Sequence, residues 1–153
     1  MEVVLSWKGR MSFEGMSDSG FRQKMDTDAA GGENSAARPM EFIAFGLAGC
    51  TGMDVISILQ KKNQAVTDFQ VRVHARQANE HPKVFSNAVI EYLVTGKDVD
   101  ETAVLRAIEL SAEKYCPAQA MLGKAFPMQL VYKIFDEDGQ TLVKQGEYKS
   151  KHL

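Results

Sequence analysis

One apolar run constrains the fold of this chain more than any other feature. Residues 39–54 read Pro-Met-Glu-Phe-Ile-Ala-Phe-Gly-Leu-Ala-Gly-Cys-Thr-Gly-Met-Asp, with almost no polar side chain before Cys50. Pro39 suits the first turn of a helix, and Glu41 complements the positive end of the helix dipole. A helix that is apolar on most sides is buried on most sides. The run therefore predicts a central buried helix from Pro39 to about residue 63.

Three glycines lie inside this predicted helix, at Gly46, Gly49 and Gly52. Each costs a helix about 1 kcal/mol relative to alanine, so something must offset the loss. Close approach of another backbone is the simplest explanation. We therefore expect this helix to pack closely against a neighbouring segment.

The remainder of the chain alternates apolar and polar residues in short stretches that are typical of strands. Turn residues separate these stretches, and residues 26–38 have the composition of a long loop. The predicted strands cover residues 3–7, 11–14, 21–25, 69–76, 84–94, 128–135 and 141–148.

A second helix is predicted after Asp98, which forms a capping-box arrangement with Glu101. Pro117 ends or kinks it, and its expected inner face comprises Leu105, Ile108, Ala112 and Tyr115. Strands and helices fall in separate blocks, which is typical of an α+β fold. We expect a single domain over residues 1–148 and a frayed tail at 149–153.

The composition is that of an ordinary globular protein and argues against several function classes. The chain has 153 residues, 25% of them charged, and a net charge of −2. It therefore lacks the basic character of a nucleic-acid-binding protein. We find neither a signal peptide nor an apolar run of membrane-spanning length, so the cytoplasm is the expected location and no membrane partner is expected. The three histidines and two cysteines show no metal-site spacing.

The two cysteines, Cys50 and Cys116, carry the functional question. In a reducing compartment they are free thiols or a transient redox pair rather than a structural disulfide. Cys50 is either a small packed core residue or a reactive thiol in a dry pocket. Cys116 lies at the carboxyl end of a predicted helix, where the dipole disfavours a thiolate, unless Pro117 opens a new turn whose positive end faces the sulfur.

Both cysteine motifs resemble those of a known family. The run at residues 39–59 and Glu-Lys-Tyr-Cys-Pro-Ala-Gln-Ala-Met-Leu at 113–122 strongly resemble the OsmC and Ohr family of osmotically induced and organic-hydroperoxide-resistance proteins. Residues 80–85 and 95–98 resemble its OsmC-like subgroup. The resemblance covers the chain from about residue 3 to residue 135.

The resemblance implies an intertwined homodimer of α+β subunits, with antiparallel sheets around the central helix and active sites at the subunit interface. It also implies an antioxidant, peroxiredoxin-like peroxidase of the bacterial cytoplasm. Cys50 would attack an organic hydroperoxide and become a sulfenic acid, and Cys116 would condense with it to a disulfide. A dithiol such as a lipoyl group would restore both thiols, and no metal or cofactor would be required.

The resemblance also implies an arginine and a carboxylate near the reactive thiol. Arg10 is the candidate arginine, with Arg22 and Arg38 behind it. Position 40, ten residues before Cys50, is methionine, and Glu41 is the carboxylate candidate. At nine residues and about 100° per residue, Glu41 points away from Cys50 on a straight helix. Its alternative role is that of a first-turn dipole partner.

Two further alternatives stay open from the sequence. His81 precedes Pro82 in a predicted hairpin turn and is either a structural residue or one that approaches a partner subunit's site. The protein itself is either the peroxidase described above or a non-catalytic dimer of the same fold, which binds a small hydrophobic or thiol-containing ligand at the subunit interface.

Overall fold

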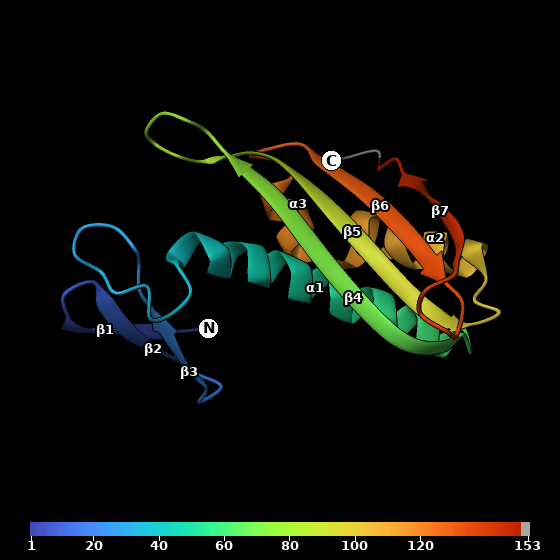
Figure 1. Cartoon of the computed structure of the whole chain (residues 1–153), viewed down its shortest axis with the longest axis horizontal. Helices are drawn as coiled ribbons and strands as arrows, with labels where there is room; N and C mark the ends of the chain where they lie inside the picture. Colours follow the sequence, from blue (N-terminus) through green and yellow to red (C-terminus); the bar gives the residue numbers. More distant parts are fainter. Residues whose placement is uncertain (151–153) are drawn as a thin grey trace. The chain divides into compact units, whose positions relative to one another are not determined.

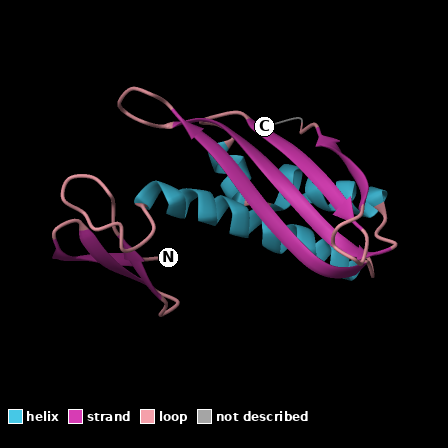
Figure 2. Ribbon diagram, in the orientation of Figure 1, coloured by secondary structure: helices cyan, strands magenta, loops and turns pink. Residues whose placement is uncertain are grey.

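The computed structural model describes residues 1–150, so most of the predicted tail at 149–153 lies outside the described residues. The α+β fold class is confirmed (Figures 1 and 2). The described residues divide into two compact units, one comprising Met1–Ala44 and the other beginning at Phe45, and the boundary falls inside helix α1. A single domain over residues 1–148 stays a prediction.

The first unit contains a three-stranded antiparallel meander, as the alternation predicted. Its strands are β1 (Val3–Gly9), β2 (Ser12–Ser17) and β3 (Arg22–Met25), in the spatial order β1-β2-β3. Its apolar side chains stay largely exposed: Val3 is 62%, Trp7 66% and Phe21 72% exposed. None of the buried apolar side chains among residues 1–150 belongs to this unit, so its sheet lacks a core of its own.

The predicted loop at residues 26–38 is organised around one buried carboxylate. Asp26 accepts hydrogen bonds from the backbone N–H groups of Thr27, Glu33 and Ser35 and from the Ser35 hydroxyl. The bonds from Ser35 contribute most to lowering the pKa of Asp26 to about 2, because they stabilise the ionised form. These hydrogen bonds thus fold the loop back onto Asp26, which is its first residue.

The second unit is built on a four-stranded sheet with the spatial order β4-β5-β6-β7. Its strands are β4 (Ala65–Gln77), β5 (Phe85–Lys97), β6 (Met128–Phe135) and β7 (Leu142–Tyr148). The β4–β5 and β6–β7 pairs are antiparallel hairpins, whereas β5 and β6 run parallel. The helical segment between β5 and β6 provides the crossover that a parallel pair needs.

The helices of this unit lie on one face of the four-stranded sheet (Figures 1 and 2). Residues of β5 and β6 alternate between buried and partly exposed, as expected for a sheet covered on one face. The buried residues form one continuous apolar core, whose fully enclosed members include Val55, Leu59, Ile90, Val94, Val104 and Ile108.

Helix α1 (Pro39–Lys61) carries the predicted central run. Arg38 N–H donates to the Glu41 carboxylate at its start. The helix ends two residues before the expected position, because Asn63 has a φ of 54° and the N–H groups of Asn63 and Gln64 bond to the carbonyls of Gln60 and Leu59. These bonds form a Schellman motif, which terminates a helix.

One face of α1 packs onto the sheet, while the other stays open in the single chain. Leu47, Val55 and Leu59 are buried on the inner face, whereas Met53 on the opposite face is 74% exposed. A Cβ at Gly52 would lie 3.2 Å from Val71 Cγ2, so β4 accounts for this glycine. A Cβ at Gly46 or Gly49 would meet nothing within 4 Å, so no described residue of this chain provides the close neighbour expected at these two glycines.

The expectation that no apolar run reaches membrane-spanning length needs a correction. By length and composition alone, α1 is long and apolar enough to cross a bilayer. The core helix of a globular protein passes the same test, and the inner face of α1 belongs to the core of the second unit. The helix therefore does not indicate a membrane protein.

The second predicted helix differs from the expectation at both ends. Helix α2 (Glu101–Leu110) is capped by Asp100, which accepts from the Thr102 N–H, rather than by Asp98. A π-helical turn, η1 (Ser111–Tyr115), follows α2 and changes the helical phase. Ile108 and Ala112 are buried as expected and Leu105 packs against the core, but Tyr115 is 49% exposed.

Removing a side chain from the inner face of α1 tests this packing. Leu59→Ala should lower the free energy of unfolding by about 2–5 kcal/mol, because it removes a fully enclosed side chain and leaves a cavity. The matched control is Gln60→Ala, since Gln60 is exposed on the same helix. Denaturant unfolding followed by circular dichroism measures both, and equal effects of the two changes would contradict the assigned inner face.

Candidate functional site

The fold brings the two cysteines of the chain together. Cys50 lies near the middle of α1 and is partly exposed, while Cys116 follows η1 and is 2% exposed. Both are free thiols, and the Cys50 side chain lies close enough to the Cys116 thiol to interact with it. Residues far apart in the sequence thus form one pair of neighbouring sulfur atoms.

The π turn and the proline position Cys116. The Cys116 N–H donates to the Ser111 carbonyl at 2.9 Å, which closes the wide turn of η1. The backbone then becomes extended at Cys116, and Pro117 opens the short helix α3 (Pro117–Leu122). Cys116 Sγ accepts the backbone N–H of Gln119 at 3.4 Å. Pro117 therefore opens a new turn, which was one of the two alternatives for this cysteine.

The environments of the two thiols differ. Burial raises the pKa of the Cys116 thiol, and the nearby Cys50 sulfur raises it further, because both disfavour a negative charge on Cys116. Cys116 is therefore a protonated thiol at neutral pH. Cys50 is the more accessible of the two, so an incoming reagent meets Cys50 first.

A buried chain of polar side chains lies beside the pair. Thr51, the residue after Cys50, is fully buried, and its Oγ1 lies 2.7 Å from the Tyr92 hydroxyl and 2.9 Å from Ser111 Oγ. Ser111 Oγ donates to the Asp54 carboxylate at 3.0 Å. Gln119 Nε2 donates to the Tyr92 hydroxyl at 3.1 Å. Burial raises the pKa of Tyr92, so its hydroxyl stays protonated.

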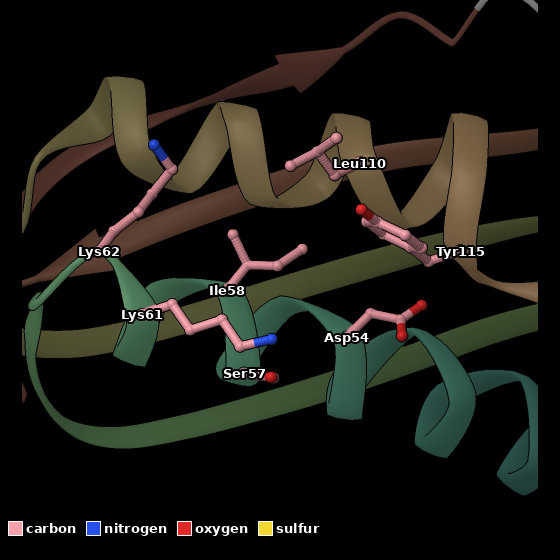
Figure 3. A pocket seen from close by; sticks show the side chains of 7 residues that line it. All are labelled: Asp54, Ser57, Ile58, Lys61, Lys62, Leu110 and Tyr115. Carbon is pink, nitrogen blue, oxygen red and sulfur yellow. The ribbon is translucent and has the colours of Figure 1, made fainter.

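This polar chain ends at an open groove of about 520 Å³ between α1 and the α2–η1 segment (Figure 3). Figure 3 shows the Asp54 carboxylate and the Tyr115 hydroxyl on opposite sides of the groove. The other lining residues are Ser57, Ile58, Lys61, Lys62 and Leu110. Asp54 is therefore the point at which the buried chain reaches solvent.

The other two predicted site residues lie in the first unit. Arg10 donates from Nε to the Gly31 carbonyl at 2.9 Å and from Nη1 to Glu33. Glu41 accepts the Arg38 N–H at 2.7 Å, which is the geometry of a first-turn cap. Both side chains thus have local structural partners, and their roles toward Cys50 stay predictions.

The remaining candidates also have local surroundings. Arg22 pairs with Glu14, and Arg38 pairs with Asp28. His81 is exposed in the turn between β4 and β5, as the hairpin prediction placed it. Within residues 1–150, no group of three or more His, Cys, Asp or Glu side chains is arranged to hold a metal ion.

The sequence-based reasoning missed the residues that surround the cysteines. Thr51, Tyr92, Ser111 and Gln119 belong to four different elements, and no spacing in the sequence links them. Two weak signals were available, because Thr51 follows Cys50 and Gln119 is three residues beyond Cys116.

Thiol labelling tests the difference in accessibility and pKa. With iodoacetamide at neutral pH, Cys50 should be labelled well before Cys116, as measured by peptide mass spectrometry. In the Cys50→Ser variant, the labelling of Cys116 should stay slow at neutral pH and accelerate only under alkaline conditions, because its raised pKa leaves little thiolate. Rapid neutral-pH labelling of Cys116 in the folded protein would contradict this description.

Comparisons with known proteins identify the family of this chain. The family model described as OsmC-like protein matches residues 32–131. The curated protein YhfA of Escherichia coli is 37% identical over 134 residues, which cover 88% of this chain and 98% of YhfA.

Solved structures show the same fold. A hypothetical protein from Aquifex aeolicus is 29% identical with a TM-score of 0.78, covering 89% of this chain and 96% of that one. An organic hydroperoxide resistance protein OsmC from Legionella pneumophila shares the fold at 14% identity and a TM-score of 0.64, covering 88% of this chain and 97% of that one. The chain belongs to the OsmC-like protein family.

Proposed function

We propose that this protein is a thiol peroxidase that reduces organic hydroperoxides in the bacterial cytoplasm. The observation that carries the proposal is that a partly exposed Cys50 and a buried Cys116 lie close enough to interact. A thiol that meets an oxidant and a protected thiol beside it are the two parts of a peroxide-reducing site. Membership of the OsmC-like family and the shared fold of an organic hydroperoxide resistance protein support this function.

The reaction proceeds in two steps on the two sulfur atoms. The Cys50 thiolate attacks the terminal oxygen of the hydroperoxide, the O–O bond breaks, and the alkoxide takes up a proton to leave as an alcohol. Cys50 is then a sulfenic acid. The Cys116 sulfur attacks Cys50 Sγ, the S–O bond breaks, and the hydroxide leaves as water with the Cys116 proton. A dithiol or lipoyl-type reductant returns the disulfide to two thiols.

The proposed working form is a homodimer. Met53 is 74% exposed on α1, and the neighbouring Gly46 and Gly49 face open space. The sheet of the first unit likewise exposes Val3 and Trp7 and has no buried core. A second copy of the chain would cover such surfaces, and small residues on a helix face permit close backbone approach. The family's usual dimeric state supports this assembly.

Hydroperoxide turnover tests the proposed reaction. Reduced protein should consume cumene hydroperoxide in the presence of a dithiol, and Cys50→Ser should abolish consumption, because the nucleophile is lost. Cys116→Ser should still form the sulfenic acid, detectable with dimedone by mass spectrometry, and should progress to the sulfinic acid because no thiol traps it.

Wild-type protein in the same assay should lose two hydrogens and gain no oxygen, as expected for a disulfide. Tyr132→Phe serves as the folding control. Tyr132 lies in β6 of the four-stranded sheet, and its hydroxyl donates to the Glu101 carboxylate instead of to a residue beside the cysteines. Turnover retained by Cys50→Ser would overturn the proposal.

A non-catalytic function of the same dimer is the second candidate. It is favoured by Arg10, whose guanidinium is already engaged by Gly31 and Glu33 instead of being reserved for a thiolate. In that case the protein binds a small hydrophobic or thiol-containing ligand without consuming hydroperoxide. The turnover assay separates the two functions.

Light scattering after size-exclusion chromatography tests the dimer. Wild-type protein should have twice the 16.9 kDa mass of one chain. Met53→Glu should raise the dimer dissociation constant by about tenfold or more, because it replaces an apolar contact worth about 1.5–3 kcal/mol with a charge. Gln60→Glu, on the same helix, should leave the dimer intact, and a monomeric wild-type protein at micromolar concentration would refute the assembly.

A further inference from the structure

The hydrogen bonds of the polar chain beside the cysteines are all donated in the same direction, and Asp54 determines that direction. A carboxylate at the open groove accepts hydrogen bonds, so the Ser111 proton is used in the bond to Asp54. The proton between Thr51 and Ser111 must then come from Thr51. By the same reasoning, the proton between Tyr92 and Thr51 comes from Tyr92.

The direction of the hydrogen bonds in the polar chain also fixes the orientation of the Gln119 side-chain amide. Because the Tyr92 proton is directed at Thr51, the Tyr92 hydroxyl accepts from Gln119, and only the amide nitrogen can donate. The complete chain therefore runs from Gln119 through Tyr92, Thr51 and Ser111 to Asp54. Every hydrogen bond in it points toward the same carboxylate.

Gln119 connects this chain to Cys116. Its side chain is anchored by Tyr92, and its backbone N–H donates to Cys116 Sγ at 3.4 Å. Ser111 makes a second connection, since its hydroxyl belongs to the chain and its carbonyl accepts the Cys116 N–H. The sulfur and the backbone nitrogen of Cys116 are thus both held by members of the chain.

Stability alone explains this arrangement poorly. Gln119 is fully buried, and its Oε1 has no hydrogen-bond partner among the described residues. An unpaired buried acceptor costs a fold about 1–3 kcal/mol, and an apolar side chain of similar length would avoid that cost. An unpaired buried polar group in a native protein calls for an explanation, and a role in function is one such explanation.

We propose that the hydrogen-bonded polar chain from the Gln119 side chain to the Asp54 carboxylate is a positioning device that holds Cys116 for attack on Cys50. The side chains of Tyr92, Thr51 and Asp54 act through Gln119 and Ser111 and do not touch the reacting atoms. This inference rests on the proposed disulfide step. It assigns roles to residues in α1, β5, η1 and α3 that have no part in the first, peroxide-dependent step.

The attack by Cys116 can be measured without any hydroperoxide. The aromatic disulfide dithiobisnitrobenzoate should react first with Cys50, releasing one coloured thionitrobenzoate and leaving a mixed disulfide. Cys116 then loses its proton to the buffer, and its sulfur attacks Cys50 Sγ. The bond from Cys50 to the aromatic sulfur breaks, and a second thionitrobenzoate leaves with the electron pair. The rate of the second release reports the attack directly.

The test compares four variants in this assay. Thr51→Val should slow the second release by about tenfold or more, because small displacements of reacting groups cost large factors in rate. Thr51→Ser should keep the rate within about threefold, because it retains the hydroxyl. Tyr92→Phe should behave like Thr51→Val. Its matched control is Tyr132→Phe, which removes a hydroxyl from the register partner of Tyr92 on β6 and should leave the rate unchanged.

Two further readouts separate positioning from stability. The first release, at Cys50, should be unchanged within about twofold in all four variants, whereas a general loosening would alter both releases. Gln119→Met should retain or raise the melting temperature, since it removes the unpaired oxygen, while it slows the second release. A wild-type rate of second release in Thr51→Val would overturn the inference.

The assay also distinguishes this inference from the proposed function. If the wild-type protein shows both releases but consumes no hydroperoxide, the peroxidase proposal fails and the positioning role stands. If it shows no second release, Cys116 does not attack Cys50 and both are overturned.

Discussion

The burial of one face of α1 against the four-stranded sheet is the interaction on which the site depends. Leu47, Val55 and Leu59 fix the rotation of the helix about its own axis. Thr51 then points into the core, and Cys50, about 100° away around the helix, lies at the border between buried and exposed surface. The partial exposure of the thiol is thus a consequence of aliphatic packing several residues away.

The same packing brings polar groups into an apolar interior. Thr51, Tyr92, Ser111 and Gln119 come from α1, β5, η1 and α3, and each is at least nine-tenths buried. Their hydrogen bonds are short and directional, whereas the surrounding aliphatic contacts tolerate small shifts. A rotation of α1 or a slip of β5 would break several bonds at once. The polar chain therefore selects one register among many that would bury similar apolar area.

The strands and the central helix could be predicted because their patterns are local. Alternation and turn signals located all seven strands, and the apolar run located α1 to within two residues of its end. The cap of α2 was placed at Asp98 instead of Asp100, because both carboxylates precede the helix and only the turn geometry decides between them. The exposure of Tyr115 was missed because a π turn leaves no sequence period.

The candidate site was predictable only in part. The order and surroundings of the two cysteines pointed to them, whereas their contact depends on how α1 and α3 pack on the same sheet. Thr51, Tyr92, Ser111 and Gln119 escaped prediction because a buried hydrogen-bond chain is a property of three-dimensional packing. Arg10 and Glu41 belong to the first unit, where their observed partners are a loop and a helix terminus.

The π turn at residues 111–115 makes the position of Cys116 depend on the number of residues in that turn. A π-helical turn closes with a hydrogen bond between residues five apart and so holds one residue more than an α-helical turn. Loss of one residue here would restore a regular helix, but it would rotate every following residue by about 100°. Cys116 would leave Cys50, and Ser111 would no longer hold its nitrogen. In this family member, a point deletion in η1 would be more damaging than most substitutions in it.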